Sequence, residues 1–394
     1  MEPTATPAES PADNTPPPAY RTLAIRFTGA GSEYFRIWIV NLLLLIVTFG
    51  IYWPWAKVRR LRYFMHNTLV DGDPLDFHGD PKQMLKGWAL VGVLFAMYNV
   101  ASSASALANL VAFAALGALW PALWRSSLRF RLGNTSWRGL RFRFSGSVAD
   151  AYRGLLPSYL AVLPLVVLGL WVPEEADAVA PDWVGGAFAG AMLLVLVLAP
   201  WLFWRMKAYQ HRNYALAHLQ TDFRAPVRAF YGLAAKQFGL MLLLPVVLVG
   251  LAWGLSTAQG EMAEMWEDLS VTQWIIGLVA LFSFMALFVG LGPWWTTRLQ
   301  NLVWTKTGNE QVRFISRLRF RDMLWLSIKN GLLMVLTLGL YWPFAAVAVA
   351  RLRLEAVQIR CVVDPETLTA QAHDNPAEAA GDAAGDFFGI DVGL

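Results

Sequence analysis

The chain has 394 residues, of which 56% are hydrophobic and only 15% are charged, against roughly 25% charged in an average soluble domain. One water-soluble core cannot hide that many apolar side chains, so the composition excludes a single soluble domain and predicts a membrane protein. The one cysteine, Cys361, excludes an intrachain disulfide framework and a cysteine-based zinc cluster.

The two ends of the chain differ from its body. Residues 1–20 hold three acidic residues, no basic residue and a proline-rich stretch. They lack the basic start and apolar core of a signal peptide, so we expect a disordered leader. Residues 364–394 hold seven acidic residues and no Lys or Arg, which predicts an acidic disordered tail. Between them, residues 21–363 form the predicted transmembrane domain, and residues 21–360 carry a net charge of +14.

Six apolar runs reach or approach the roughly 20 residues that a helix needs to span hydrocarbon. They hold almost no charge and are Ile37–Trp55, Trp88–Trp124, Gly154–Trp171, Val184–Trp204, Phe238–Leu255 and Val271–Trp295. Tryptophans stand mainly at the ends of these runs, as in the aromatic belt of a membrane interface. The runs therefore predict a helical protein that crosses the bilayer several times.

Two segments far apart in the chain share the ungapped pattern Asn-x6-Thr-x-Gly-x-Tyr-Trp-Pro. Its residues are Asn41, Thr48, Gly50, Tyr52, Trp53 and Pro54 in the first segment and Asn330, Thr337, Gly339, Tyr341, Trp342 and Pro343 in the second. The same proline recurs ahead of basic residues as Pro54, Pro121, Pro200, Pro293 and Pro343. Recurrence of this kind indicates internal repeats and predicts about five diverged units, at roughly 22–76, 77–143, 144–222, 223–312 and 313–363.

Short strand-like stretches flank the predicted helices. Asp-Gly and Arg-Gly inside Thr68–Phe77 and Thr135–Phe144 predict two β-hairpins, and Leu23–Phe27, Val312–Phe320 and Ile359–Val363 look like further strands. The predicted fold class is an all-α polytopic membrane protein of about five diverged repeats. Short cytoplasmic β-hairpins are expected at the junctions between units.

The charges predict the orientation of the middle units. In units three and four, a loop with only acidic charges splits the apolar stretch, as Glu174, Glu175, Asp177 and Asp182 and as Glu261, Glu264, Glu267 and Asp268. The junctions between units are rich in arginine instead. Since Lys and Arg favour the cytoplasmic side, we expect cytoplasmic junctions, external acidic loops and three transmembrane hairpins, from units two, three and four.

Units one and five each have a single apolar run with basic residues on both sides. Each run is either one full span or a re-entrant hairpin, broken at Phe49-Gly50 and at Leu338-Gly339. Re-entry requires protein to shield the broken backbone. We favour re-entry, because it keeps every basic helix and strand on one side of the membrane, where the strands could pair.

The stretch from Phe27 to Gly79 contains the string GIYWPWAKVRRLRYF and resembles the YjgN family of bacterial inner-membrane proteins. The resemblance continues through Leu338–Arg353 and covers essentially residues 22–363. It implies a multi-pass protein of the bacterial inner (plasma) membrane. It brings no activity, substrate or catalytic residue with it.

Motifs of catalysis are missing from the sequence. It contains no phosphate-binding G-x-x-x-x-G-K-[ST], no H-E-x-x-H and no G-x-S-x-G, and no carboxylate lies deep in an apolar run, where a proton relay would need one. We therefore expect no enzymatic activity, no catalytic residue, no metal site and no cofactor. A nucleic-acid partner is not expected either.

The most regular polar feature is a set of arginines after the recurring proline: Arg59, Arg62, Arg125, Arg129, Arg205 and Arg298. The simplest interpretation is that they fix the topology and contact anionic lipid headgroups, at about 1 kcal/mol per charge. The functional hypothesis is that they converge into a basic cytoplasmic vestibule for a lipid or small anionic solute. The alternative is a membrane scaffold that binds partner proteins, not identifiable from the sequence, through its β-segments and acidic tail.

Overall fold

The computed structural model describes residues 20–169, 171, 181–242, 250, 289–362 and 366. The predicted leader and nearly all of the predicted acidic tail lie outside the described residues. So do both acidic loops except for Asp182, and most of the apolar stretch of unit four.

The described chain is mostly helical, and its helices come in consecutive pairs. The pairs are α1 (Gly31–Val47) with α2 (Trp53–His66), α3 (Pro81–Ala104) with α4 (Ala106–Gly133), α5 (Val148–Gly169) with α6 (Asp182–Arg212), and α9 (Phe320–Leu336) with α10 (Trp342–Glu355). Residues 227–242 and 289–305 are also helical. Of the helices that the structure describes, α3, α4, α5 and α6 are long and apolar enough to cross a membrane. No more than 22% of any of their apolar windows is buried, as expected of surfaces that face lipid.

The short strands join in one antiparallel sheet instead of staying as separate hairpins. They are β1 (Arg21–Phe27), β2 (Thr68–Val70), β3 (Asp73–Phe77), β4 (Thr135–Trp137), β5 (Leu140–Phe144), β6 (Tyr214–Leu216), β7 (Leu219–Gln220), β8 (Val312–Ser316) and β9 (Val357–Cys361). The order across the sheet is β7-β6-β5-β4-β3-β2-β1-β9-β8. The all-α description is therefore incomplete, because the strands at the junctions build a common nine-stranded element.

The two edges of this sheet meet. Phe223, just after β7, bridges Thr307, and Gly308 bridges Arg313 of β8. The amide of Gly308 also donates to the carbonyl of Asp222 at 2.9 Å. Gly308 has a φ of 138°, and a Cβ there would collide with the backbone of Val312, so only glycine fits. Closure leaves few unpaired edge groups, and side chains from strands around the ring form an apolar interior that includes Leu23, Val70, Trp137, Leu140 and Cys361.

The same kind of backbone hydrogen bond occurs at five places where a helical segment leaves the sheet. In each case an amide just after one strand donates to the carbonyl just before the next: Thr28 to Asn67, His78 to Asn134, Ser145 to Asn213, Arg224 to Lys306 and Arg317 to Ala356, at 2.8–3.0 Å. Six residues after each donor, a side chain is buried, as Tyr34, Met84, Ala151, Phe230 and Met323. Each helical segment therefore leaves the sheet in the same local way.

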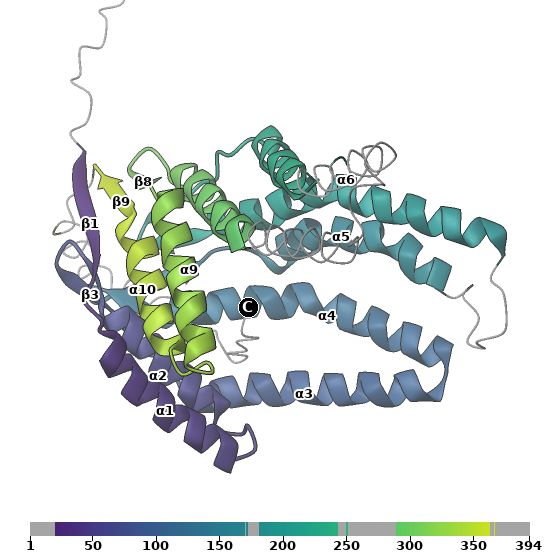
Figure 1. Ribbon diagram of the computed structural model, residues 1–394, viewed down its shortest axis with the longest axis horizontal. Coiled ribbons are helices and arrows are strands. Elements are labelled where there is room, and N and C mark those ends of the chain that lie inside the picture. Colours follow the sequence, from purple (N-terminus) through teal and green to yellow (C-terminus); the bar gives the residue numbers. More distant parts are fainter. Residues whose placement is uncertain are drawn as a thin grey trace, which may run out of the picture.

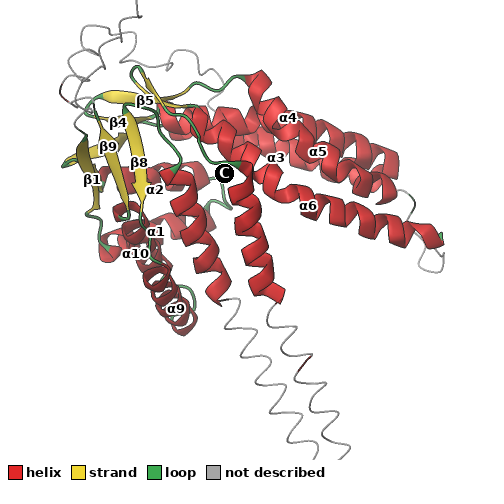
Figure 2. Ribbon diagram, turned by 90° about the horizontal axis from the view of Figure 1, so that it is seen from above, coloured by secondary structure: helices red, strands yellow, loops and turns green. Residues whose placement is uncertain are grey.

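The helix pairs leave the sheet without forming one parallel bundle. In Figure 1 the strands gather at one end of the molecule, and α3–α6 extend furthest from it. Figure 2 shows α3–α6 leaving the sheet in a different direction from α1, α9 and α10. Much of the apolar helix surface consequently has no protein neighbour among the described residues.

The two copies of the Asn-Thr-Gly-Tyr-Trp-Pro pattern fold as helical hairpins. The chain reverses at Phe49-Gly50, with φ of 50° and 89°, and at Leu338-Gly339, with φ of 49° and 89°. The hydroxyl of Thr48 donates to the Leu44 carbonyl and accepts from the Tyr52 amide, and Thr337 makes the same two bonds with Leu333 and Tyr341. Pro54 and Pro343 stand in the first turn of α2 and α10, where a proline costs no hydrogen bond.

At both tips an apolar side chain is almost fully exposed, Phe49 at 95% and Leu338 at 94%. The helices have 17 and 14 residues in each pair, and none of them is among the four candidate membrane spans of the described residues. The break positions named from the sequence are therefore where the helices end.

Cys361 is only 3% exposed inside the closed sheet. We predict that a maleimide leaves Cys361 unlabelled in the folded, detergent-extracted protein and labels it fully after denaturation, because the reagent needs an accessible thiolate. Mass spectrometry measures the labelled fraction, with Ser103→Cys, near the exposed α3–α4 tip, as the reactive control. Fast labelling of native Cys361 would show that the sheet opens.

Candidate ligand-binding site

The six arginines named from the sequence do not line a common pocket. Arg59 and Arg62 lie on α2 and share a pocket with Arg36 and His66. Arg129, on α4, lines a different pocket beside His78 and Arg143. Arg298 is exposed on the helix of residues 289–305 and lines two others. In the part of the chain that the structure describes, these four arginines are distributed among separate pockets.

Two of the six arginines tie one helix pair to the next. Arg62 donates to the carbonyl of Gly79 at 3.2 Å, and Arg125 donates to that of Gly146 at 2.7 Å. Three other side chains make the corresponding contact at 2.8 Å: Trp204 with Ala225, Asn301 with Leu318 and Arg351 with Gly29. All five acceptor residues are buried and stand two residues after the end of a strand segment. We call these five contacts the inter-unit hydrogen bonds.

Arg59 and Arg205 also have local contacts. Arg59 donates to Oδ1 of Asn41 at 3.5 Å and lies over the Tyr52 ring. Arg205 donates to the carbonyl of Arg153 and lies 5.1 Å from the centre of the Trp201 ring. These contacts hold the arginines against the helices, and none of them requires a ligand.

We call Arg60, Lys207 and Arg353 the central basic cluster, because Arg60 and Arg353 line one cavity and Lys207 interacts electrostatically with Arg353. Nε of Arg353 donates to Oε1 of Gln300 at 2.7 Å, and Nε2 of Gln300 donates back to the Arg353 carbonyl at 2.9 Å. Lys207, on α6, is within electrostatic reach of Arg353 and donates to Gln210 at 3.1 Å. Arg60, on α2, lies 5.3 Å from the centre of the Trp342 ring.

Among the residues that the structure describes, no ion pair joins this cluster to an acidic side chain. Arg60 and Arg353 are exposed and Lys207 is half-buried, so an anion can approach these cations from solvent. The cluster is therefore suited to an anion.

Arg60 and Arg353 lie at the edge of a cavity of about 790 Å³ beside α9 and α10, which we call the α9–α10 cavity. Its polar lining is completed by Gln300, Ser327 and Asn330, and its walls are largely apolar: Ile25, Phe64, Trp304, Phe314, Gly331, Met334, Trp342, Ala345, Ala346, Val349, Ala350, Leu354 and Val357. The volume falls in the range of small-molecule sites, which combine apolar walls with a few polar groups.

Asn330 is the exceptional residue of this cavity. It is 4% exposed, and neither Nδ2 nor Oδ1 has a hydrogen-bond partner in the described protein. Asn41, its counterpart in the shared pattern, is 7% exposed and accepts from Arg59. Ala348 stands where Arg59 would be, five residues after the proline. The carboxamide of Asn330 therefore lacks the partner that satisfies Asn41.

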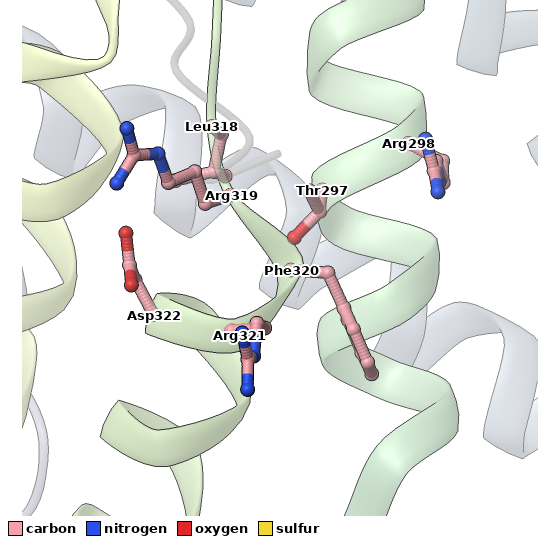
Figure 3. A pocket seen from close by; sticks show the side chains of 7 residues that line it. All are labelled: Thr297, Arg298, Leu318, Arg319, Phe320, Arg321 and Asp322. Atoms are coloured by element: carbon pink, nitrogen blue, oxygen red, sulfur yellow. The ribbon is translucent and has the colours of Figure 1, made fainter.

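A second pocket, of about 530 Å³, lies between residues 297–298 and the start of α9. In Figure 3 the side chain of Arg298 points away from those of Arg319 and Asp322, on the opposite side of its helix. Three arginines and one carboxylate line this pocket, as Arg298, Arg319, Arg321 and Asp322. The α9–α10 cavity differs in having no carboxylate in its lining to repel an anion.

Residues 22–387 match the family described as "Bacterial protein of unknown function (DUF898)". The chain belongs to this family. It is 23% identical over 367 residues to "Inner membrane protein YjgN" of Salmonella typhimurium, covering 87% of this chain and 90% of the relative. Proteins of the same name from Escherichia coli O157:H7 and K12 are 30% and 33% identical over 36% and 31% of each chain. No solved structure matches.

The family and the four apolar helices confirm the resemblance and the location inferred from the sequence: this is a multi-pass protein of the bacterial inner membrane. The central basic cluster was not foreseen. A signal for two of its three cations is the spacing from the recurring proline: Lys207 and Gln300 both stand seven residues after it, and Gln210 and Arg353 both stand ten after it, whereas Arg60 stands six after it. Positions three apart share a helix face, so the residues seven and ten after the proline form one stripe across several units.

The inter-unit hydrogen bond of Arg351 is predicted to stabilise the fold. Replacing Arg351 with Gln removes the guanidinium that reaches the Gly29 and Phe27 carbonyls, and a buried acceptor left without a donor costs about 1–3 kcal/mol. Denaturant unfolding of the detergent-extracted protein should show this loss. Arg228→Gln, which removes an exposed arginine, should change the free energy of unfolding by about 0.5 kcal/mol or less. Equal stability of the two variants would contradict a structural role for this bond.

Proposed function

We propose that this inner-membrane protein is not an enzyme and that it binds an anionic lipid or small anionic solute at its cytoplasmic face. The observation that carries the proposal is the grouping of Arg60, Lys207 and Arg353 without an acidic partner in the described residues. An anion in contact with this cluster would pair with cations that have no acidic partner among the described residues. Bonds to charged groups typically contribute about 1.5–3 kcal/mol each.

The proposal includes five repeated units arranged around the closed sheet. The five equivalent backbone hydrogen bonds and the five inter-unit hydrogen bonds support it, since each occurs once per predicted unit. The bond from Arg351 to Gly29 joins the last unit to the first. On this interpretation the ring needs both ends of the domain, and the central basic cluster lies where second helices of several units meet.

The proposed topology places the sheet in the cytoplasm. The pairs α3–α4 and α5–α6 cross the bilayer as hairpins, and α1–α2 and α9–α10 enter from the cytoplasmic side and return. Re-entry requires satisfied backbone groups at the turn, and here the amides of Gly50 and Gly339 donate to Leu45 and Met334 at 2.8 Å. The exposed tips at Phe49 and Leu338 would then contact acyl chains.

The scaffold alternative depends on the acidic tail, which lies outside the described residues except for Glu366. Deleting residues 364–394 separates the two functions. Anion binding at the central basic cluster should survive the deletion, whereas partner binding through the tail should be lost.

Single-cysteine variants in a Cys361→Ala background test the topology in intact cells. A membrane-impermeant maleimide should label Ser103→Cys, near the α3–α4 tip, and should label Glu310→Cys, in an exposed turn of the sheet, only after lysis. Phe49→Cys should resist labelling from both sides, because a tip buried in lipid excludes the charged reagent. Labelling of Phe49→Cys from outside would mean that the first hairpin crosses the membrane.

Removal of one cation should weaken anion binding. We predict that Arg353→Gln or Lys207→Gln raises the Kd for glycerol 3-phosphate, a small soluble anion, about tenfold or more, as expected when a charge-assisted bond is lost. Calorimetry on the detergent-extracted full chain measures this constant. Arg298→Gln, outside the cluster, should leave it unchanged. A comparable loss in all three variants would show that binding follows total charge, against the proposed site.

A further inference from the structure

We propose that the α9–α10 cavity holds an anionic lipid with one acyl chain and a free hydroxyl beside its acyl linkage, and that Asn330 recognises this linkage. A monoacyl glycerophospholipid is the simplest lipid with these groups. The inference deepens the proposed function and rests on it, because the phosphate of the lipid would need the central basic cluster.

The cavity changes character along the α9–α10 hairpin. Arg353 lines the cavity near the end of α10 that leads into β9, and Arg60 lines it beside Trp342, near the start of α10. Met334, close to the tip of the hairpin, is apolar. Eleven residues separate Trp342 from Arg353, or about 16 Å at 1.5 Å per residue. A ligand with a charged head and an apolar chain matches this polarity better than a small solute does.

The apolar end of the cavity lies next to the part of the protein that is most suited to contact lipid. Directly after Met334 come Val335 and Leu336, both highly exposed, and then the exposed tip at Leu338. If the hairpin enters the bilayer as proposed, the acyl chain of a bound lipid would lie beside the chains of the membrane. The head would lie at the cytoplasmic face, against the basic residues.

Asn330 lies between these two ends, about one helical turn from Ser327 on the same face of α9. A carboxamide donates through Nδ2 and accepts through Oδ1, and both atoms of Asn330 are buried without a partner in the described residues. An ester carbonyl can accept from Nδ2, and a hydroxyl on the neighbouring carbon can donate to Oδ1. In a monoacyl glycerophospholipid both groups lie between the phosphate and the chain, and along α9 Asn330 lies between Ser327 and Met334 of the cavity lining.

The test compares Asn330→Leu with the matched control Asn41→Leu in the detergent-extracted full chain. The probes are monoacyl phosphatidylglycerol below its micelle concentration, diacyl phosphatidylglycerol, and glycerol 3-phosphate, with native mass spectrometry for the lipids and calorimetry for the soluble anion. Wild-type protein should bind the monoacyl lipid more tightly than the other two. Asn330→Leu should weaken monoacyl binding about tenfold, the factor expected for two neutral hydrogen bonds, and should leave glycerol 3-phosphate binding unchanged.

Thermal unfolding without ligand gives a second readout. Asn330→Leu should raise the melting temperature, because it removes two buried polar atoms without partners. Asn41→Leu should lower it, because it takes an acceptor from Arg59, while monoacyl lipid binding stays normal. A tenfold loss in both variants would show a general packing effect and overturn the role of Asn330.

The remaining outcomes separate this inference from the proposed function. If wild-type protein binds glycerol 3-phosphate as well as any lipid, the site takes a soluble anion and the lipid inference is wrong. If diacyl lipid binds as tightly as monoacyl lipid, the free hydroxyl is not recognised and that part of the inference is wrong. If Asn330→Leu binds monoacyl lipid normally while Arg353→Gln does not, the proposed function holds and the inference fails. If wild-type protein binds none of the probes, both fail.

Discussion

The arrangement of the helix pairs depends on buried main-chain carbonyls that need a donor. Each of the five carbonyls stands between a strand segment and the helix that follows it, and each accepts a bond from a side chain of a neighbouring helix. The donors are Arg62, Arg125, Trp204, Asn301 and Arg351, so the geometry is kept while the chemistry of the donor changes. Since buried backbone groups are almost always paired, the same requirement acts at every junction and fixes how neighbouring units meet.

Because the sheet closes, these hydrogen bonds are enough to hold the helix pairs in place. Strands of two or three residues, such as β2 and β7, are too short to form a stable sheet alone. The end strands β7 and β8 are linked through residues 307–309, and the apolar interior around Trp137 is shared by strands that lie far apart in the chain. The helices are fixed where they leave the sheet, so they do not need to pack as one bundle. Their uncovered apolar surfaces can then face lipid, which is as apolar as the side chains themselves.

The sequence predicts local parts of this fold better than the ring. Asp71-Gly72 and Arg138-Gly139 are turn signals, and both pairs have positive φ, so the β2–β3 and β4–β5 hairpins could be foreseen. The β6–β7 hairpin turns at Ala217, which also has positive φ but carries no turn signal. The bridge between Phe223 and Thr307 joins segments far apart in the chain, and no local pattern encodes such a pairing.

The same limit applies to the candidate site. Arg59 drew attention because its spacing after the proline recurs, but its side chain turns to Asn41. Arg60 is adjacent in sequence and lies on another face of α2, toward Trp342. Only the assembled ring brings Arg60 near Arg353, because α2 and α10 belong to opposite ends of the chain. A regular spacing identifies equivalent positions, whereas convergence depends on how the units meet.

Near-copies within one chain also show where a structural role has been lost. Asn41 and Asn330 occupy the same position of the same pattern. The helical hairpin forms in both copies, whether or not this asparagine has a hydrogen-bond partner in the described protein. Arg59 donates a hydrogen bond to Asn41. Ala348 stands at the equivalent position of the second copy, and Asn330 has no hydrogen-bond partner in the described protein. An unpaired buried carboxamide costs stability and is tolerated most easily where something else completes its bonds. The departure from symmetry, rather than the repeated arginines, therefore singles out Asn330 as a buried side chain without a partner among the described residues.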